Sequence, residues 1–214
     1  MTAREYHERT KHSYESVRRN AHVLDWENQP LGFKIYPDLE AIPLPREPAE
    51  ARGLAGLTRL LYFSAGITKK KQYPGGEILF RAAACTGALY EIELYVVCGP
   101  LEDLPPGVYH FGPGDFALRR LREGDWRGAL RAMPPAPLYV ISTGTYWRNA
   151  WKYQARTYRH FGWDNGTILA NLTEVAAALR WKARVAAGFV DREVNALLGH
   201  PVFPQERCEI PEVS

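Results

Sequence analysis

The stretch from Cys85 to Val97 reads C-T-G-A-L-Y-E-I-E-L-Y-V-V. Its first part is a turn of small residues around Gly87, which can take a positive φ, or admit another group close to the backbone, without steric cost. Its second part, from Ile92 onward, is rich in β-branched and apolar residues and predicts a strand buried over most of its length. The stretch therefore predicts a tight glycine turn entering a core strand. Such a turn is either a plain structural connection or one that offers backbone N–H groups to a flat or anionic ligand.

The segments around this stretch predict both helices and strands. Apolar residues recur at helical spacing over residues 54–65, and Gly66 is placed to end that helix. The turn signal at residues 112–115 predicts a hairpin between strands at 108–111 and 117–121. Further elements are expected downstream: a buried strand at 138–143, a helix at 165–183, a short strand at 184–188, and a last helix with Asp191 as its N-cap and Gly199 at its end. Since helices and strands do not alternate regularly, we predict an α+β fold rather than a doubly wound parallel sheet.

The first 50 residues predict an arm that precedes the main domain. A polar helix is expected over residues 5–20, and the prolines that follow forbid a long helix and favour an extended chain. We therefore divide the chain into a helix and proline-rich arm (1–50) and a main domain (51–214). The arm lies across its own core or across a neighbouring subunit. The basic run Lys69-Lys70-Lys71 is expected in a solvated loop, with a phosphate or acidic-peptide contact as the alternative, and Gly75-Gly76 in a flexible loop.

The composition is that of a soluble globular protein, because 46% of the 214 residues are hydrophobic and 24% are charged. The net charge of +3 argues against a dedicated nucleic-acid binder, and no apolar run is long enough to span a bilayer. Neither the three cysteines (Cys85, Cys98, Cys208) nor the six histidines show metal-ligand spacing, so no metal site is predicted. A polar N-terminus without a signal-peptide core makes a reduced, cytoplasmic location the default.

Several other phrases accompany the 85–97 stretch in a fixed order. They are Tyr6-His7-Glu8-Arg9-Thr10-Lys11-His12, Lys34-Ile35-Tyr36-Pro37, Pro106-Gly107-Val108-Tyr109-His110-Phe111, Lys152-Tyr153-Gln154-Ala155-Arg156-Thr157-Tyr158-Arg159, Ala187-Gly188-Phe189-Val190-Asp191 and Asn195-Ala196-Leu197-Leu198-Gly199. The ordered series resembles the nitroreductase-like flavoenzymes, specifically the azoline dehydrogenases of the SagB type. The resemblance covers nearly the whole chain, from residue 5 to residue 200.

This resemblance implies a nitroreductase-like fold, with a central, mainly antiparallel sheet flanked by helices, and an intertwined homodimer that holds FMN at its seam. It also implies that Lys152 and Tyr153 are catalytic. Oxidising an azoline removes a proton from carbon and passes a hydride to the flavin, so a base must stand beside the ring. The ordinary lysine pKa of about 10.4 must then be lowered, which burial and the cations Arg148 and Arg156 would do. On residue chemistry alone, the alternative is a basic, aromatic helix face that packs through its side-chain stems.

The resemblance also implies a set of cofactor-binding residues: Cys85, Thr86, Gly87, Ala88, Leu89, Arg159, Ala187, Gly188 and Phe189. Two of these turns depart from the family pattern, since Cys85-Thr86 replaces Pro-Ser and Ala187 replaces the first glycine of Gly-Gly-Phe. The family's Arg-Arg-Ser-x-Arg segment, which grips the FMN phosphate, is absent from residues 44–53. Arg46 and Arg52 could substitute for it in part, and the lysines at 69–71 are another source of charge.

Two functions follow from these observations. The first is an FMN-dependent oxidoreductase that acts on a peptide-borne azoline or on a small aromatic or nitro compound. The alternative is a flavin-free, catalytically degenerate subunit that binds or scaffolds a partner. The missing arginine segment favours the alternative, and the retained Lys152-Tyr153 and Thr86-Gly87 favour the enzyme.

Overall fold

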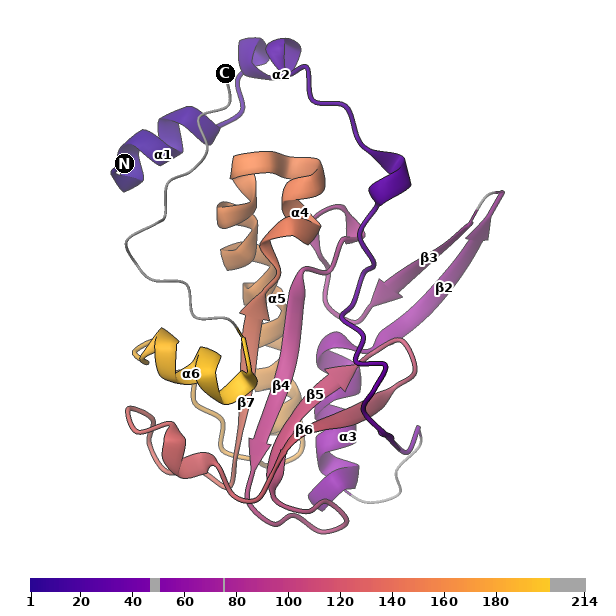
Figure 1. Ribbon diagram of the computed structural model, residues 1–214, viewed down its shortest axis with the longest axis vertical. Helices are drawn as coiled ribbons and strands as arrows, with labels where there is room; N and C mark the ends of the chain where they lie inside the picture. Colours follow the sequence, from indigo (N-terminus) through magenta and orange to yellow (C-terminus); the bar gives the residue numbers. More distant parts are fainter. Residues whose placement is uncertain (47–50, 75, 201–214) are drawn as a thin grey trace.

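A five-stranded antiparallel sheet, in the order β1-β6-β5-β4-β7, forms the centre of the computed structural model (Figure 1). The structure describes residues 1–46, 51–74 and 76–200. The strands of the sheet are β1 (Ala41–Pro43), β4 (Ile92–Cys98), β5 (Gly107–Gly112), β6 (Ala117–Glu123) and β7 (Leu138–Gly144). Every residue of β4 is buried, because β4 pairs with β5 on one side and with β7 on the other.

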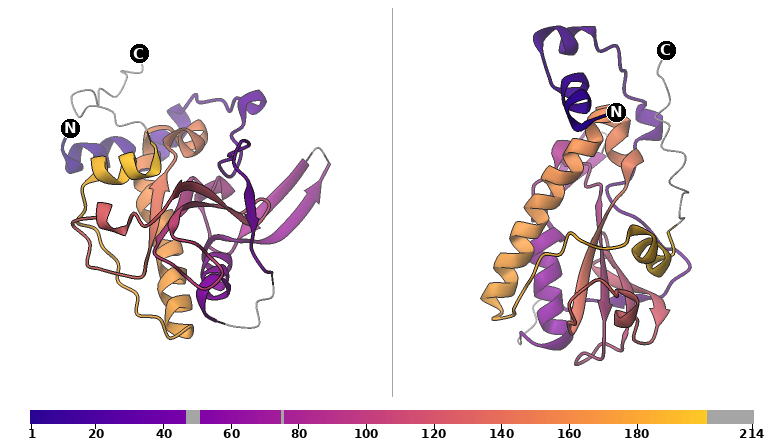
Figure 2. Two further views of the ribbon diagram at one scale, coloured as in Figure 1. Left: turned by 60° about the horizontal axis from the view of Figure 1, so that its bottom comes forward. Right: turned by 90° about the vertical axis from the view of Figure 1, so that its left-hand side faces the viewer.

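Helices cover both faces of this sheet (Figure 2). On one face, α3 (Gly53–Ala65) and α5 (Thr157–Ala178) pack against each other, and α6 (Asp191–Leu198) covers the other face. At the end where β4 begins lies α4 (Tyr146–Tyr153), with the N-terminal helices α1 (Ala3–Thr10) and α2 (Tyr14–Arg19) beyond it (Figure 1). Four 3₁₀ turns complete the described elements: η1 (Trp26–Asn28), η2 (Thr86–Ala88), η3 (Arg127–Ala129) and η4 (Gln154–Arg156).

The two-residue period of β4 creates a separate core on each face of the sheet. Ile92, Leu94 and Val96 belong to the cluster that packs against α3 and α5. Tyr95 and Val97 belong to the smaller cluster beneath α6. Both faces of β4 are covered by helices, so its side chains other than Glu93 are mostly apolar.

A second, two-stranded sheet projects from the domain as a hairpin of β2 (Ile67–Tyr73) and β3 (Gly76–Arg81) (Figure 1). The lysines at 69–71 lie in β2 and are exposed. The prediction of a loop at these residues is therefore wrong, and the prediction that their side chains are solvated is confirmed. Lys70 forms an ion pair with Glu77 across the hairpin, at 3.9 Å. Of the predicted Gly75-Gly76 loop, Gly76 begins β3 and Gly75 lies outside the described residues.

The predicted α+β class and antiparallel sheet are confirmed. The helix expected over residues 54–65 is α3, and the hairpin expected around residues 112–115 joins β5 to β6. The single helix expected over residues 5–20 is wrong. Thr2 and Ser13 each form a capping box, so two short helices begin separately. The arm after them crosses its own chain rather than lying free, because His22 contacts the Trp151 carbonyl at 2.8 Å and β1 pairs with β6.

Near the C-terminus three features differ from expectation. Helix α5 begins at Thr157 rather than at residue 165, because its first turns bury polar side chains (Thr157, His160, Asp164) that an apolar period does not reveal. No strand forms at 184–188, where the residues are exposed and pair with no other described strand. Asp191 is the first helical residue of α6 rather than its N-cap, and Gly199 ends that helix at φ +74° as predicted.

Among the described residues, no helix combines the length and the apolar character that crossing a membrane requires.

Candidate functional site

The turn between Cys85 and Tyr90 has an unusual backbone that closes against α4. Gly87 has φ +65°, and Ala88 and Tyr90 both have φ +54°. Positive φ values at residues other than glycine are uncommon and carry strain, and they cluster at functional sites. The turn hydrogen-bonds within itself, since the Ala88 N–H donates to the Cys85 carbonyl at 3.1 Å. The predicted glycine turn is therefore present and more strained than a plain connection between elements.

Tyr153, the last residue of α4, lies directly on this turn. A Cβ atom added at Gly87 would come within 2.5 Å of the Tyr153 hydroxyl oxygen, so glycine is required for this approach. On its other side, the Tyr153 ring meets the edge of His160 with ring centres 4.7 Å apart. Lys152 is half-buried, and its Nζ lies 5.5 Å from the centre of the Tyr153 ring. The structure thus brings the two predicted catalytic residues together with the predicted Thr86-Gly87 turn.

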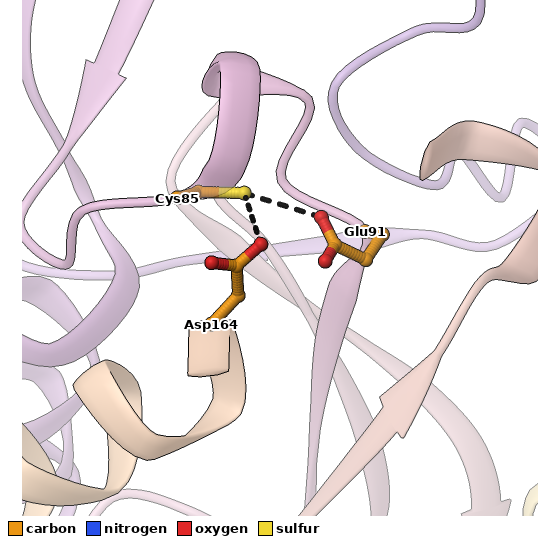
Figure 3. Close-up of side chains that lie close together, drawn as sticks. All are labelled: Cys85, Glu91 and Asp164. Atoms are coloured by element: carbon orange, nitrogen blue, oxygen red, sulfur yellow. Dashed lines mark hydrogen bonds between the residues drawn. The ribbon is translucent and has the colours of Figure 1, made fainter. Parts of the chain in front are cut away.

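Beneath the turn, three acidic groups face one another (Figure 3). The Cys85 Sγ lies 3.1 Å from a carboxylate oxygen of Glu91 and 3.3 Å from one of Asp164. Asp164 also accepts hydrogen bonds from the Thr86 N–H (3.0 Å) and the Thr86 hydroxyl (2.8 Å). The donors expected of Thr86 for a ligand are therefore already used to hold the turn onto α5.

The electrostatics of this cluster follow from burial. Glu91 is fully buried, and burial, together with its hydrogen bond to Asp164, raises the pKa of Glu91 to about 7. Burial and the two neighbouring carboxylates also raise the pKa of the Cys85 thiol, so this cysteine is not an activated nucleophile. Burial, followed by the fields of Cys85, Asp164 and Glu91, raises the pKa of Tyr153 as well. Tyr153 is therefore a neutral phenol at physiological pH.

A buried ion network on the other face of β4 fixes the position of α4. The Arg148 Nη1 donates to Glu93 at 2.6 Å and to the Tyr90 carbonyl at 2.7 Å. His110 contacts the second oxygen of Glu93 at 2.9 Å. Burial alone would raise the pKa of Glu93, but the His110 hydrogen bond and the charges of Arg148 and Arg81 hold it below its usual value. Arg148 is thus bound to Glu93 and is not a free cation beside Lys152.

A cationic cluster lies where α1 meets the start of α5. Arg156 donates to the Thr10 carbonyl, and the Arg159 Nη2 donates to the Thr10 hydroxyl at 2.8 Å. Both guanidinium groups contact Thr10 and so lie close together, and burial with the charge of Arg159 lowers the pKa of Arg156. The Nε atoms of both arginines are buried without a hydrogen-bond partner, and neither side chain pairs with a carboxylate in the described ranges.

Of the remaining predicted site residues, Ala88 and Leu89 belong to the turn, and those at 187–189 lie in a separate segment. Ala187, Gly188 and Phe189 are exposed in the irregular segment between α5 and α6. Leu89 is buried, and Ala88 is half-buried in the turn. Of the proposed substitutes for the arginine segment, Arg46 lies over the Phe116 ring and Arg52 precedes α3. The start of α3 is at the opposite end of the sheet from α4 (Figure 1).

Sequence reasoning missed the acidic residues Glu91, Glu93 and Asp164. A signal for two of them was present, because Glu91 and Glu93 interrupt an otherwise apolar strand and a buried carboxylate needs a partner. Asp164 gave no such signal, since it lies in a polar stretch where exposure is the normal expectation.

The Glu93 network generates the first prediction. Glu93→Gln keeps the shape of the side chain but leaves Arg148 buried without its counter-charge, so we expect the free energy of unfolding to fall by about 3–5 kcal/mol. Urea denaturation measures this change. The matched control is Glu123→Gln, which breaks the exposed Arg120–Glu123 pair and should cost at most about 1 kcal/mol. Equal losses in the two variants would contradict the importance of the buried pair.

The contact between Gly87 and Tyr153 generates the second prediction. Gly87→Ala forces alanine to φ +65° and pushes its Cβ into the Tyr153 hydroxyl. Gly199→Ala is the matched control, because Gly199 has φ +74° but nothing within 4 Å of an added Cβ. Both variants should lose about 1–2 kcal/mol from backbone strain, and Gly87→Ala about 1–3 kcal/mol more from the clash. Tyr153→Phe should recover part of that excess in a double-mutant cycle, and additive effects would argue against the contact.

His160 generates a pH prediction. Burial, followed by the charge of Arg156, lowers its pKa in the folded chain, while Asp164 opposes the shift only in part. Below the unfolded-state pKa of about 6.5, the unfolded chain therefore binds the proton first, and stability falls as the pH falls. We expect His160→Gln to lose stability less steeply than the wild type between pH 7 and pH 5, as measured by urea denaturation. Identical slopes would show that His160 does not titrate in this way.

Comparison with known proteins gives a consistent assignment. The chain matches no protein-family model and no curated protein. A solved structure from Anabaena variabilis, assigned as a nitroreductase, shares 33% sequence identity with this chain and superposes with a TM-score of 0.83. The match covers 93% of this chain and 43% of the Anabaena variabilis chain. The chain thus spans less than half the length of that neighbour.

Two further structures are similar in fold alone. A protein from Ralstonia eutropha, also assigned as a nitroreductase, is 20% identical with a TM-score of 0.57, covering 76% of this chain and 70% of its own. The E. coli microcin synthetase complex McbBCD, with truncated pro-MccB17 bound, is 21% identical with a TM-score of 0.59, covering 92% of this chain and 80% of the neighbour. The antiparallel sheet between helices and these similarities together show that the chain has a nitroreductase-like fold.

Proposed function

We propose that the chain is an FMN-dependent oxidoreductase of the SagB type, which oxidises azoline rings in peptides. Small aromatic or nitro compounds are the second substrate class. The observation that carries the proposal is the pair of arginines Arg156 and Arg159. They lie on the segment directly after Lys152 and Tyr153, and they have no carboxylate partner among residues 1–46, 51–74 and 76–200.

The arginine pair fits a phosphate group. Two guanidinium groups held close together repel each other, and their buried Nε atoms have hydrogen-bonding capacity left over. An anion with several acceptor oxygens would relieve both costs through charge-assisted hydrogen bonds. Arg156 and Arg159 would therefore hold the phosphate that the family's missing arginine segment holds elsewhere. The 85–89 turn, with Ala187, Gly188 and Phe189, remains the predicted surface for the flavin ring.

Lys152 and Tyr153 supply the acid–base chemistry in this proposal. FMN, when bound, would accept the hydride from the azoline ring. Lys152 is half-buried and reaches solvent, so its amine is placed to accept the ring proton and to release it to water. Tyr153 is held on two sides, by Gly87 and by His160, and its raised pKa keeps the phenol protonated as a hydrogen-bond donor that orients the substrate.

A peptide substrate is supported by one of the fold neighbours, which was solved with truncated pro-MccB17 bound. An intertwined homodimer and a cytoplasmic location belong to the same proposal. A second copy would cover the exposed aromatic side chains around α4 and the start of α5 (Tyr146, Trp147, Tyr158 and Trp163).

FMN binding tests the proposal directly. The purified protein should be yellow and release FMN on denaturation, and Arg156→Ala or Arg159→Ala should weaken FMN binding by about tenfold to a hundredfold, since a charged hydrogen bond is worth about 1.5–3 kcal/mol. Riboflavin, which lacks the phosphate, should bind wild type and variants equally. Arg46→Ala, which removes a guanidinium that lies over the Phe116 ring, is the matched control and should bind FMN normally.

A separate variant tests the chemistry. Lys152→Ala should stay yellow but no longer oxidise a thiazoline-containing peptide, as followed by mass spectrometry through the loss of two hydrogen atoms. A colourless protein that also refuses added FMN would instead support the flavin-free scaffold. Unchanged oxidation by Lys152→Ala would remove that residue from its assigned role.

A further inference from the structure

Cys85, Glu91 and Asp164 come from three different elements and point their acidic atoms at one another (Figure 3). Cys85 precedes the strained turn, Glu91 immediately precedes β4, and Asp164 lies in α5. One ligand atom from each lies within 4.8 Å of the other two. Glu91 is 0% exposed and Asp164 5% exposed, so water does not solvate these oxygens freely.

One oxygen of this cluster has no partner. The Glu91 Oε1 atom is buried and accepts no hydrogen bond in the described structure, and Figure 3 shows the Glu91 carboxylate turned toward Asp164. A proton shared by the two carboxyls, or a cation between them, would offset the cost of burying these acidic groups together. Arg81 interacts electrostatically with Cys85, but its guanidinium donates to the Gly32 carbonyl and lies over the Tyr90 ring.

We propose that Cys85, Glu91 and Asp164 form a binding site for a divalent transition-metal ion of the Zn²⁺ type. A sulfur ligand with two carboxylate oxygens suits such an ion and does not suit Mg²⁺ or Ca²⁺, which prefer oxygen alone. Neither the spacing of the cysteines nor that of the histidines predicts this site, because two of its ligands are carboxylates and one of these, Asp164, comes from a distant helix.

The distances agree with tetrahedral coordination. Metal bonds of about 2.3 Å to sulfur and about 2.0 Å to oxygen place the two kinds of ligand about 3.5 Å apart in a tetrahedron. The observed separations of 3.1 Å and 3.3 Å are slightly shorter, so the ion fits after a small outward shift of the side chains. A cavity of about 10 Å³, lined by Cys85 and Asp164 among others, adjoins the site.

The surroundings orient the ligands as metal sites usually require. The Thr86 N–H and hydroxyl donate to Asp164, and the Tyr90 N–H donates to the Cys85 Sγ at 3.0 Å. Binding would release to solvent the thiol proton and the proton shared by the carboxyls. The ion would then clamp the turn that touches Tyr153 to helix α5.

Cobalt titration tests the site. The experiment uses the Cys208→Ser protein, because the Cys208 thiol lies outside the described residues. A chelator first removes bound metal, and the protein is then titrated with Co²⁺ in the absence of oxygen. We expect one Co²⁺ per chain, with the near-ultraviolet absorption of a thiolate-to-cobalt transition. Cys85→Ser should abolish that absorption, and Glu91→Gln and Asp164→Asn should each weaken binding by more than about tenfold.

The matched control is Cys98→Ser, which removes a buried thiol from β4 and should leave the cobalt spectrum unchanged. X-ray absorption of the zinc-loaded Cys208→Ser protein does not depend on how the site variants fold, and it should show one sulfur at about 2.3 Å. A missing sulfur signal, or a cobalt absorption that survives Cys85→Ser, would overturn the proposal and leave the cluster holding only a proton.

Discussion

The position of the candidate site depends on the buried ion pair between Glu93 in β4 and Arg148 in α4. The two charges are almost fully buried, and His110 from β5 contacts the second oxygen of the same carboxylate. Arg148 also binds the carbonyl of Tyr90, so one guanidinium joins the sheet, the strained turn and the helix that ends in Lys152 and Tyr153. Removing one partner of such a pair is costly because the other charge stays buried. Strand β4 and α4 are therefore held in one relative position.

Around Tyr153 the structure separates charge by sign. Below the turn lies the acidic cluster of Cys85, Glu91 and Asp164, and at the junction of α1 and α5 lie Arg156 and Arg159. His160 connects the two regions, because it packs against Tyr153 while Arg156 and Asp164 shift its pKa in opposite directions. A neutral phenol between an anionic and a cationic region is a suitable place for a reaction in which a proton and an electron pair leave in different directions.

The departures from the family pattern concentrate at the same place. Cys85 stands in the turn where the family has Pro-Ser, and the usual arginine segment is absent from residues 44–53. Each departure has a local counterpart in the structure: the cysteine meets two carboxylates, and two arginines occur on the segment after α4. The chain also spans less than half of its Anabaena variabilis neighbour.

The sequence by itself determined the elements whose signals are local. The apolar run at 92–97, the helical period at 54–65 and the turn at 112–115 fixed β4, α3 and the β5–β6 hairpin, because periodicity and turn chemistry act over a few residues. The ordered phrases also predicted the nitroreductase-like fold. Only the tertiary structure decided which charges meet. Glu91 lies beside Asp164, and Glu93 pairs with Arg148, although more than 50 residues of chain separate the members of each pair. Such pairing depends on how the sheet and helices pack rather than on any local pattern. The early start of α5 has the same cause, since its first turns bury polar groups that only their partners make acceptable.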